Sequence, residues 1–318
     1  MIKTDLNVSI VVPVFNEEDS LISLVDQINK VMIRTNEKYE IIVVNDGSLD
    51  KSKKVLESLT RSIEELIAID LRRNYGQSAA MAAGFDFAKG EFIITLDGDL
   101  QNDPNDIPEL IKTIREGYDL VSGWRYKRQD GFLLRKLPSK VANKLIGKVT
   151  GIQLNDYGCS LKAYRKEVLT DIRLYGELHR FLPVLANIEG ARIKEMKVNH
   201  FPRKYGKSKY GIDRTFRVLM DLLTVWFMNR FLTRPMYVFG FIGIISIFSS
   251  SLISFYLIFL KYLGQDIGTR PLLLFALILG LAGVQLFCFG LLGELQMRTY
   301  HESQNRPIYR IREIIQKR

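Results

Sequence analysis

Residues 91–101 read Glu91-Phe92-Ile93-Ile94-Thr95-Leu96-Asp97-Gly98-Asp99-Leu100-Gln101, and this stretch decides the fold. An apolar run of strand length ends directly in two aspartates that are two positions apart. Carboxylates at one strand end can converge on a hard cation, and Mg²⁺ and Mn²⁺ prefer oxygen ligands. The stretch predicts a buried strand with a metal site at Asp97 and Asp99, where Gln101 supplies or orients a third ligand. Taken alone, an Asp-x-Asp pair is also common in surface turns.

Strand-like and helix-like segments alternate on both sides of this stretch. The predicted strands are Val8–Val14, Tyr39–Val44, Leu66–Asp70, Glu91–Leu96 and Asp119–Ser122, and the predicted helices are Ser20–Arg34, Ser52–Glu65, Ser78–Lys89 and Ile107–Glu116. Such alternation predicts an α/β fold with a mainly parallel sheet and helices on both faces. Ligands of these sheets bind beyond the carboxyl ends of the strands. The polar residues Asn16, Glu17, Asp46, Asp97 and Asp99 all fall at those ends.

The composition changes sharply along the 318 residues, although the formal net charge of +10 describes the whole chain. Residues 1–212 read as a soluble domain, whereas Met236–Leu260 and Pro271–Gly293 carry no charged residue. A helix needs about 20 apolar residues to cross a bilayer. We therefore expect a two-helix transmembrane hairpin within residues 235–293, with spans at about 236–260 and 272–293; the alternative is a pair of buried core helices. Nothing at the N-terminus resembles a signal peptide.

The charges around the hairpin predict its orientation. Its flanks carry Arg230, Arg234, Arg298, Arg306, Arg310, Arg312, Lys317 and Arg318, whereas the short loop offers only Lys261 and Arg270. The positive-inside rule then places both termini, the domain of residues 1–212 and the basic tail 294–318 in the cytoplasm. Residues 213–234 resemble an amphipathic helix lying at the membrane surface, although an ordinary domain helix is the alternative. The two cysteines form no disulfide or zinc pattern, which suits a reducing cytoplasm.

A second polar turn, Asn45-Asp46-Gly47-Ser48, follows the second predicted strand. Asp46 could accept hydrogen bonds from a base or a ribose. It could equally form an Asx-turn or begin the following helix. The turn alone does not decide between these roles.

Taken together, the motifs carry a resemblance. Val11–Glu18, Asn45–Ser48 and Asp97–Gln101, in this order and spacing, resemble the family 2 glycosyltransferases with a GT-A (Rossmann-like) fold. Further similarity to the dolichyl-phosphate mannose synthase branch lies in Asp103-Pro104, Gly123-Trp124-Arg125 and the segment Arg203–Tyr210. The two spans bring the match closer to bacterial polyprenyl-phosphate (bactoprenol) glucosyltransferases. The family often has Ala where this chain has Gly98.

The resemblance implies roles for individual residues. The nucleotide-sugar would be bound by Pro13, Phe15, Glu17, Asp46, Asp97, Arg203 and Lys209, the metal by Asp97, Asp99 and Gln101, and the acceptor phosphate by Arg125 and Arg135, with Arg128 as a rival for Arg135. Asp156 is the candidate base or positioning group; its alternative is a turn-forming aspartate. His179–Phe181 and Lys207 would add contacts to the diphosphate. The basic loop 203–210 could instead bind anionic lipid headgroups.

The implied activity is inverting transfer of a sugar, with glucose from UDP-glucose expected, to polyprenyl (undecaprenyl) phosphate at the cytoplasmic face of the cell membrane. It requires Mg²⁺ or Mn²⁺ and serves cell-wall or O-antigen glycosylation. A phosphate acceptor has a second pKa near ~6, so it needs no strong base. Expected partners are the nucleotide-sugar, the polyprenyl phosphate and the bilayer; a homo-oligomer and a lipid-sugar flippase are further hypotheses. Nucleic acid is not expected, because the excess basic charge lies beside the spans and catalytic loops.

Three alternatives stay open at this point. The same reaction could use GDP-mannose or another UDP-sugar. The chain could build a polysaccharide or glycosylate a lipid hydroxyl, although the Q-x-x-R-W motif of processive synthases is absent from the sequence. It could also be a non-catalytic membrane scaffold with a degenerate transferase domain, against which Asp46, Asp97 and Asp99 count.

Overall fold

The structure is a computed structural model. It describes residues 6–126, 143, 146–147, 150–170, 172, 174, 176, 178–188, 190–203, 236–268, 270–303 and 311–316. The chain divides into two compact units, residues 1–225 with 307–318 and residues 226–306. The expected amphipathic helix 213–234 lies outside the described residues.

The first unit is built on an eight-stranded sheet of order β7-β5-β6-β4-β1-β2-β3-β8. Its strands are β1 (Val8–Val14), β2 (Tyr39–Asn45), β3 (Leu66–Leu71), β4 (Phe92–Thr95), β5 (Leu120–Arg125), β6 (Lys162–Arg165), β7 (Ile193–Val198) and β8 (Ile311–Gln316). The pairs of β1 with β2 and β4, of β2 with β3, and of β5 with β7 are parallel. Only β6 and β8 run antiparallel to their neighbours. The expected mainly parallel α/β sheet is therefore confirmed.

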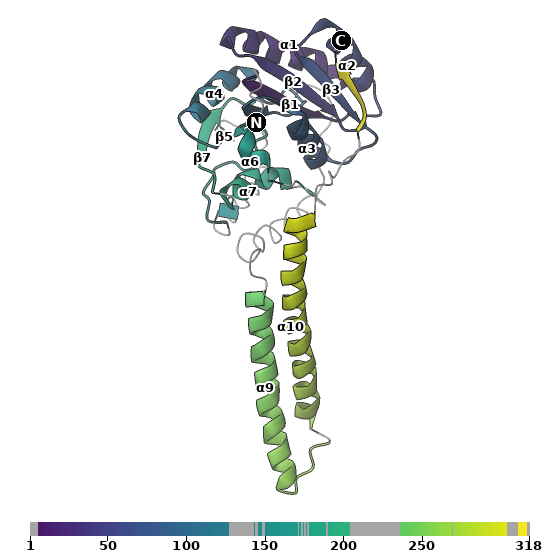
Figure 1. Ribbon diagram of the computed structural model, residues 1–318, viewed down its shortest axis with the longest axis vertical. Coiled ribbons are helices and arrows are strands. Elements are labelled where there is room, and N and C mark those ends of the chain that lie inside the picture. Colours follow the sequence, from purple (N-terminus) through teal and green to yellow (C-terminus); the bar gives the residue numbers. More distant parts are fainter. Residues whose placement is uncertain are drawn as a thin grey trace. The chain divides into compact units, whose positions relative to one another are not determined.

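Helices cover both faces of the sheet. They are α1 (Glu18–Thr35), α2 (Ser52–Ser62), α3 (Gln77–Phe87), α4 (Ile107–Arg115), α6 (Lys166–Thr170) and α7 (Leu182–Ile188), with short 3₁₀ turns η1 (Pro104–Asp106) and η3 (Leu178–Phe181). Alternate β1 side chains, such as Val8 and Ile10, join α1, α2 and α4 in one apolar core. On the other face α3 approaches β1 so closely that a Cβ at Gly84 would lie 2.2 Å from a Val11 methyl. In Figure 1, α1 and α3 lie on opposite sides of β1–β3.

The predicted elements are confirmed in the first half of the chain, with three differences. The strand predicted to end at Ser122 continues to Arg125, because β7 pairs along its whole length through Arg125 and Val198. The second helix ends at Ser62 rather than Glu65, since Ile63 is already extended. β6 and β7 were not predicted, and β6 separates β4 from β5 in the sheet.

The second unit is a helical hairpin of α9 (Met236–Tyr262) and α10 (Pro271–Ser303). Its segments Phe239–Tyr262 and Pro271–Gly293 are long and apolar enough to cross a membrane. Glycines let the two backbones meet, because a Cβ on Gly243 would lie 2.7 Å from the carbonyl oxygen of Gly283. Small residues at such contacts are typical of membrane helix pairs. The predicted helix pair is confirmed.

The basic tail contains a strand that the sequence reading did not predict. β8 pairs antiparallel with β3, from Ile67 opposite Gln316 to Leu71 opposite Ile311. The sheet is thus completed by residues that lie beyond the hairpin in the chain. β8 also covers the edge of β3, whose backbone groups would otherwise be unpaired.

We expect removal of residues 311–318 to weaken β3 specifically. Each lost backbone hydrogen bond is worth about 0.5–1.5 kcal/mol, so exchange of the uncovered β3 amides should accelerate by at least about 2–10-fold. Hydrogen–deuterium exchange of the peptide covering Leu66–Leu71 measures this. Removal of Lys317 and Arg318 alone is the control. Unchanged protection of β3 in the longer truncation would contradict the pairing.

Candidate active site

The turns that follow β1 and β2 are bonded to each other. Ser48 Oγ accepts from the Asn16 amide at 2.9 Å, and Asn16 Oδ1 accepts from the Leu49 amide at 2.7 Å. Asn16 has a left-handed backbone with φ of 50°. These bonds fix the carboxyl ends of two adjacent strands, so Phe15 and Glu17 occupy defined, half-buried positions at the edge where ligands of such sheets bind.

Asp46 holds the loop that leads into α3. Its two carboxylate oxygens accept from the amides of Tyr75 and Gly76 at 2.7 and 2.9 Å. Burial raises the pKa of Asp46 to about 6, although both hydrogen bonds oppose this rise. Gly47, at φ of 65°, allows the close approach, since a Cβ there would lie 2.3 Å from the Arg73 carbonyl carbon. Asp46 thus stabilises the loop before α3, in addition to any contact with a nucleotide.

Asp97 and Asp99 lie together at the end of β4, as predicted. Gln77 Nε2, at the start of α3, donates to Asp97 Oδ1 at 2.8 Å. Burial and the neighbouring Asp99 carboxylate raise the pKa of Asp97. Gly98 between them also has a physical reason, because a Cβ there would lie 2.7 Å from a Val14 methyl. Two adjacent carboxylates in this position attract a cation.

Arg203 provides a cation at these carboxylates. Its Nη2 lies 2.8 Å from Asp99 Oδ2 and 3.6 Å from Glu17 Oε1. The structure therefore brings together Glu17 and Arg203, which were predicted to bind the nucleotide-sugar, and Asp99, which was predicted to bind the metal. Their ion pairing was not predicted.

Asp97 and Asp99 suit a divalent cation that also binds a substrate. Among the described residues, no three His, Cys, Asp or Glu side chains gather into a metal-binding group. Mg²⁺ is, however, typically held by one or two carboxylates together with substrate phosphates. The backbone amide of Gln101 donates to Asp99 Oδ1 at 3.2 Å, and its side-chain Nε2 donates to the Phe201 carbonyl at 3.5 Å. The ion pair of Asp99 with Arg203 shows that a positive charge is favourable beside these carboxylates.

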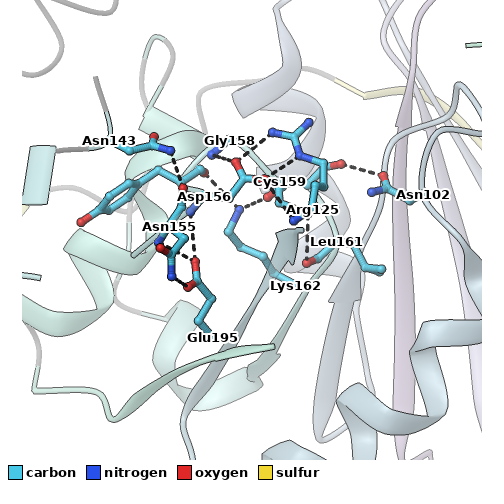
Figure 2. A network of polar contacts seen from close by, with 12 residues as sticks. Asn102, Arg125, Asn143, Asn155, Asp156, Gly158, Cys159, Leu161, Lys162 and Glu195 are labelled. Carbon is cyan, nitrogen blue, oxygen red and sulfur yellow. Dashed lines mark hydrogen bonds and ion pairs between the residues drawn. The ribbon is translucent and has the colours of Figure 1, made fainter. Parts of the chain in front are cut away.

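Arg125 and Asp156 form a two-point ion pair. Arg125 Nε and Nη2 donate to the two oxygens of Asp156 at 2.7 and 2.9 Å. Both side chains are largely buried, at 14% and 5% exposure. Burial opposes the charged form of Arg125, but the bonds and charge of Asp156 outweigh this and raise its pKa. Figure 2 shows the pair within a larger polar network.

Lys162 is a buried cation in this network that sequence reasoning missed. Its Nζ donates to the carbonyl oxygens of Cys159 and, at 3.4 Å, of Tyr157. Burial lowers the pKa of Lys162 and raises that of the Cys159 thiol to about 11. The alternation of β6 could have signalled a strand, but nothing local to Lys162 distinguishes it from a surface lysine.

Two further polar side chains, Glu195 and His179, have defined hydrogen-bond partners. Glu195 on β7, which was not predicted, accepts from the amides of Asn155 and Asp156. His179 is buried, its Nδ1 lies 2.8 Å from Ser78 Oγ, and burial lowers its pKa to about 3. The contact of the 179–181 segment to the diphosphate stays a prediction.

Several predicted residues cannot be placed. Arg135, its rival Arg128, Lys207 and Lys209 lie outside the described residues. Pro13 lies in β1 opposite Val44 and is half-buried at the strand end.

A family comparison agrees with this geometry. The profile of Glycosyl transferase family 2 matches residues 9–173, which contain β1–β6, Asp46, the Asp97–Asp99 pair and the Arg125–Asp156 pair. The chain belongs to glycosyltransferase family 2, and it is a glycosyltransferase.

Relatives extend the similarity over the whole chain. The chain is 46% identical over 314 residues to a dodecaprenyl-phosphate galacturonate synthase of Rhizobium johnstonii, covering 97% of this chain and 93% of that protein. It is 40% identical to an undecaprenyl-phosphate 4-deoxy-4-formamido-L-arabinose transferase of Proteus mirabilis, covering 97% and 94%. The resemblance to polyprenyl-phosphate glycosyltransferases is thereby confirmed. These relatives do not support glucose as the sugar.

A solved structure confirms the GT-A fold. Glucosyl-3-phosphoglycerate synthase from Mycobacterium tuberculosis, crystallised with Mn²⁺, UDP and phosphoglyceric acid, superposes with a TM-score of 0.54. The identity is 16%, and the match covers 70% of this chain and 78% of that one. At this identity the likeness concerns the fold alone.

Replacing Asp46 with alanine should release the loop before α3. Two amides would lose buried acceptors, at a cost of about 1–3 kcal/mol each. We expect faster hydrogen exchange at Tyr75 and Gly76. The matched control is Asp50→Ala, because Asp50 also accepts from two amides, those of Glu18 and Ser52. Equal exchange at Tyr75 and Gly76 in wild type and Asp46→Ala would refute this structural task.

Proposed function

We propose that the chain transfers a sugar from a UDP-sugar to a polyprenyl phosphate at the cytoplasmic face of a membrane, with inversion at the anomeric carbon. The carrying observation is the match along 97% of the chain to a polyprenyl-phosphate sugar synthase, which includes the helical hairpin. A long-chain lipid acceptor requires an enzyme at the bilayer, and α9 and α10 have the length and apolarity to hold it there. We also propose that the chain forms a homo-oligomer and that a lipid-sugar flippase is its partner.

The sugar we propose is galacturonate, with 4-deoxy-4-formamido-L-arabinose as the second candidate. Both come from the names of the relatives, at 46% and 40% identity. Glucose, which the sequence motifs suggested, becomes a competitor to be tested.

In the proposed reaction, an oxygen of the acceptor phosphate attacks the anomeric carbon. The carbon–oxygen bond to UDP breaks with its electron pair, so an α-linked donor gives a β-linked product. The phosphate has a second pKa near ~6 and is largely ionised at neutral pH, so it needs no base. Asp156 then acts as the partner of Arg125. A guanidinium has five N–H donors, and two of them go to Asp156, so Arg125 can also donate to the acceptor phosphate.

Asp97, Asp99 and Gln101 are the residues that would hold Mg²⁺ or Mn²⁺, which would neutralise charge on the departing diphosphate. Arg203 pairs with Asp99 in the described geometry. In the proposal the Arg203 guanidinium turns to the diphosphate once both substrates are bound. Lys209 is proposed as a second contact to the diphosphate. Pro13, Phe15, Glu17 and Asp46 line the nucleotide end.

The pairing of β8 supports the proposed topology. β3 precedes the hairpin in the chain and β8 follows it, yet both belong to one sheet. If α9 and α10 each cross the bilayer, both ends of the hairpin must lie on the same side. The basic residues at both flanks favour the cytoplasm as that side.

The donor is tested with the purified full-length protein, Mn²⁺, polyprenyl phosphate and one nucleotide-sugar at a time. We expect mass spectrometry to detect lipid-phosphate galacturonate from UDP-galacturonate, at a rate at least about tenfold above that with UDP-glucose, which is the discrimination of about 1.4 kcal/mol that one added contact supplies. A preference for UDP-glucose or GDP-mannose would overturn the sugar assignment. No lipid product from any donor would overturn the proposed function.

Topology is tested with two reporter fusions. A reporter after Arg318 should read as cytoplasmic, and one inserted near Gln265, in the loop between α9 and α10, as external. The reverse pattern would place the site away from cytoplasmic nucleotide-sugars and contradict the proposal.

A further inference from the structure

The turn of residues Asn155–Cys159, called here the 155–159 turn, carries Asp156 and is held from outside itself. Asp156 Oδ1 accepts from the Gly158 amide at 3.1 Å within the turn. That bond shapes the turn locally, but it does not fix the turn relative to β5, which carries Arg125. Arg125 on β5 bonds to Asp156 directly, and Asn143 Nδ2 donates to the Asn155 carbonyl at 2.6 Å. Further contacts that hold the backbone of the turn come from β7 and β6.

Glu195 on β7 makes the larger set of these contacts. Its Oε1 accepts from the amides of Asn155 and Asp156 at 2.8 and 3.0 Å, and its Oε2 accepts from Asn155 Nδ2 at 2.6 Å. Three N–H groups thus converge on one carboxylate, and Figure 2 shows it beside Asn155 and Asp156. From β6, Lys162 holds the other end of the turn through the Cys159 carbonyl.

These bonds form a chain that leads to Arg125. Glu195 fixes the backbone nitrogen of Asp156, and the carboxylate of Asp156 fixes both Nε and Nη2 of Arg125. Asp156 also accepts from the Arg125 amide at 3.3 Å. The direction of the guanidinium therefore depends on where Glu195 holds the turn.

Strand pairing does not require Glu195. β5 and β7 pair over six residues, from Leu120 with Ile193 to Arg125 with Val198. At their opposite end a second carboxylate, Asp119, accepts from the Arg192 amide at 2.8 Å and from its Nε at 3.1 Å. The Glu195 carboxylate is instead directed at the turn, and part of its surface is buried there.

We propose that Glu195 is a positioning residue for the acceptor half of the site, which sets the Arg125 guanidinium by clamping the backbone of Asn155 and Asp156. This inference rests on the proposed function, in which Arg125 donates to the acceptor phosphate. Glu195 touches neither substrate; it acts through Asp156.

The test compares full-length variants in acceptor kinetics and in donor binding. Glu195→Ala leaves two amides without their acceptor, so kcat/KM for polyprenyl phosphate should fall on the order of 10–100-fold. UDP binding measured without acceptor should stay within about twofold of wild type, because the donor residues are untouched. Glu195→Gln should recover most of the activity, since one amide oxygen can still accept from both backbone amides.

A double-mutant cycle separates positioning from general damage. If Glu195 acts through Arg125, the double variant Glu195→Ala/Arg125→Ala should be no worse than Arg125→Ala alone, to within about twofold. Asp119→Ala, which removes the similar carboxylate at the far end of the same strands, should leave kcat/KM unchanged. If Glu195→Ala does not fold, Glu195→Asp, which withdraws the same carboxylate by one methylene, takes its place in the cycle.

Additive losses in the double variant, an equal loss in Asp119→Ala, or full activity in Glu195→Ala would each overturn the positioning role. Failure of the proposed function looks different. In that case wild-type protein would use another acceptor, and the coupling between Glu195 and Arg125 would be measured on that acceptor.

Discussion

Carboxylates placed close together at the end of β4 need cations, and the organisation of the site follows from that need. Burial, and after it the neighbouring Asp99 carboxylate, raise the pKa of Asp97. Arg203 forms an ion pair with Asp99, and the nearby Arg125 forms one with Asp156. Opposite charges thus alternate along the carboxyl edge of the sheet. The proposed substrates fit such an edge by charge. The metal is positive and suits the carboxylates, whereas the phosphates of donor and acceptor are negative and suit the arginines.

The fold supports this edge by bonding each turn to its neighbour. The turns after β1 and β2 share the bonds of Asn16 and Ser48, and Asp46 connects the second turn to the loop before α3. Ser20 Oγ, at the start of α1, donates to the Gly98 carbonyl at 2.7 Å and links the first turn to the aspartate pair. In the proposed reaction, the donor half of the site is built from β1, β2, β4 and α3, and the acceptor half from β5, β6 and β7.

Local sequence predicted the first half of the sheet well and the second half poorly, for a physical reason. β1 to β4 are short apolar runs such as Phe92–Thr95, whose length and β-branched residues favour buried strands. β7 reads Ile-Lys-Glu-Met-Lys-Val and is half-exposed, so no apolar period marks it. Asp97, Asp99 and Arg125 were found because motifs at strand ends mark them. Gln77 and Glu195 act through contacts with Asp97 and Asp156, which lie 20 and 39 positions away in the chain, so no local pattern marks them. Lys162 bonds to the Cys159 carbonyl only three positions away, but that contact depends on the fold of the turn before β6.

In the proposed reaction, the carboxylates at the end of β4 bind a divalent cation jointly with the nucleotide diphosphate. Calorimetric titration of Mn²⁺ into the full-length protein, with and without UDP, tests it most directly. We expect UDP to tighten Mn²⁺ binding in wild type, Asp99→Asn to lose this coupling, and Asp103→Asn, at the half-buried N-cap of η1, to keep it. Equal Mn²⁺ affinity with and without UDP in wild type, or coupling that persists in Asp99→Asn, would contradict the account.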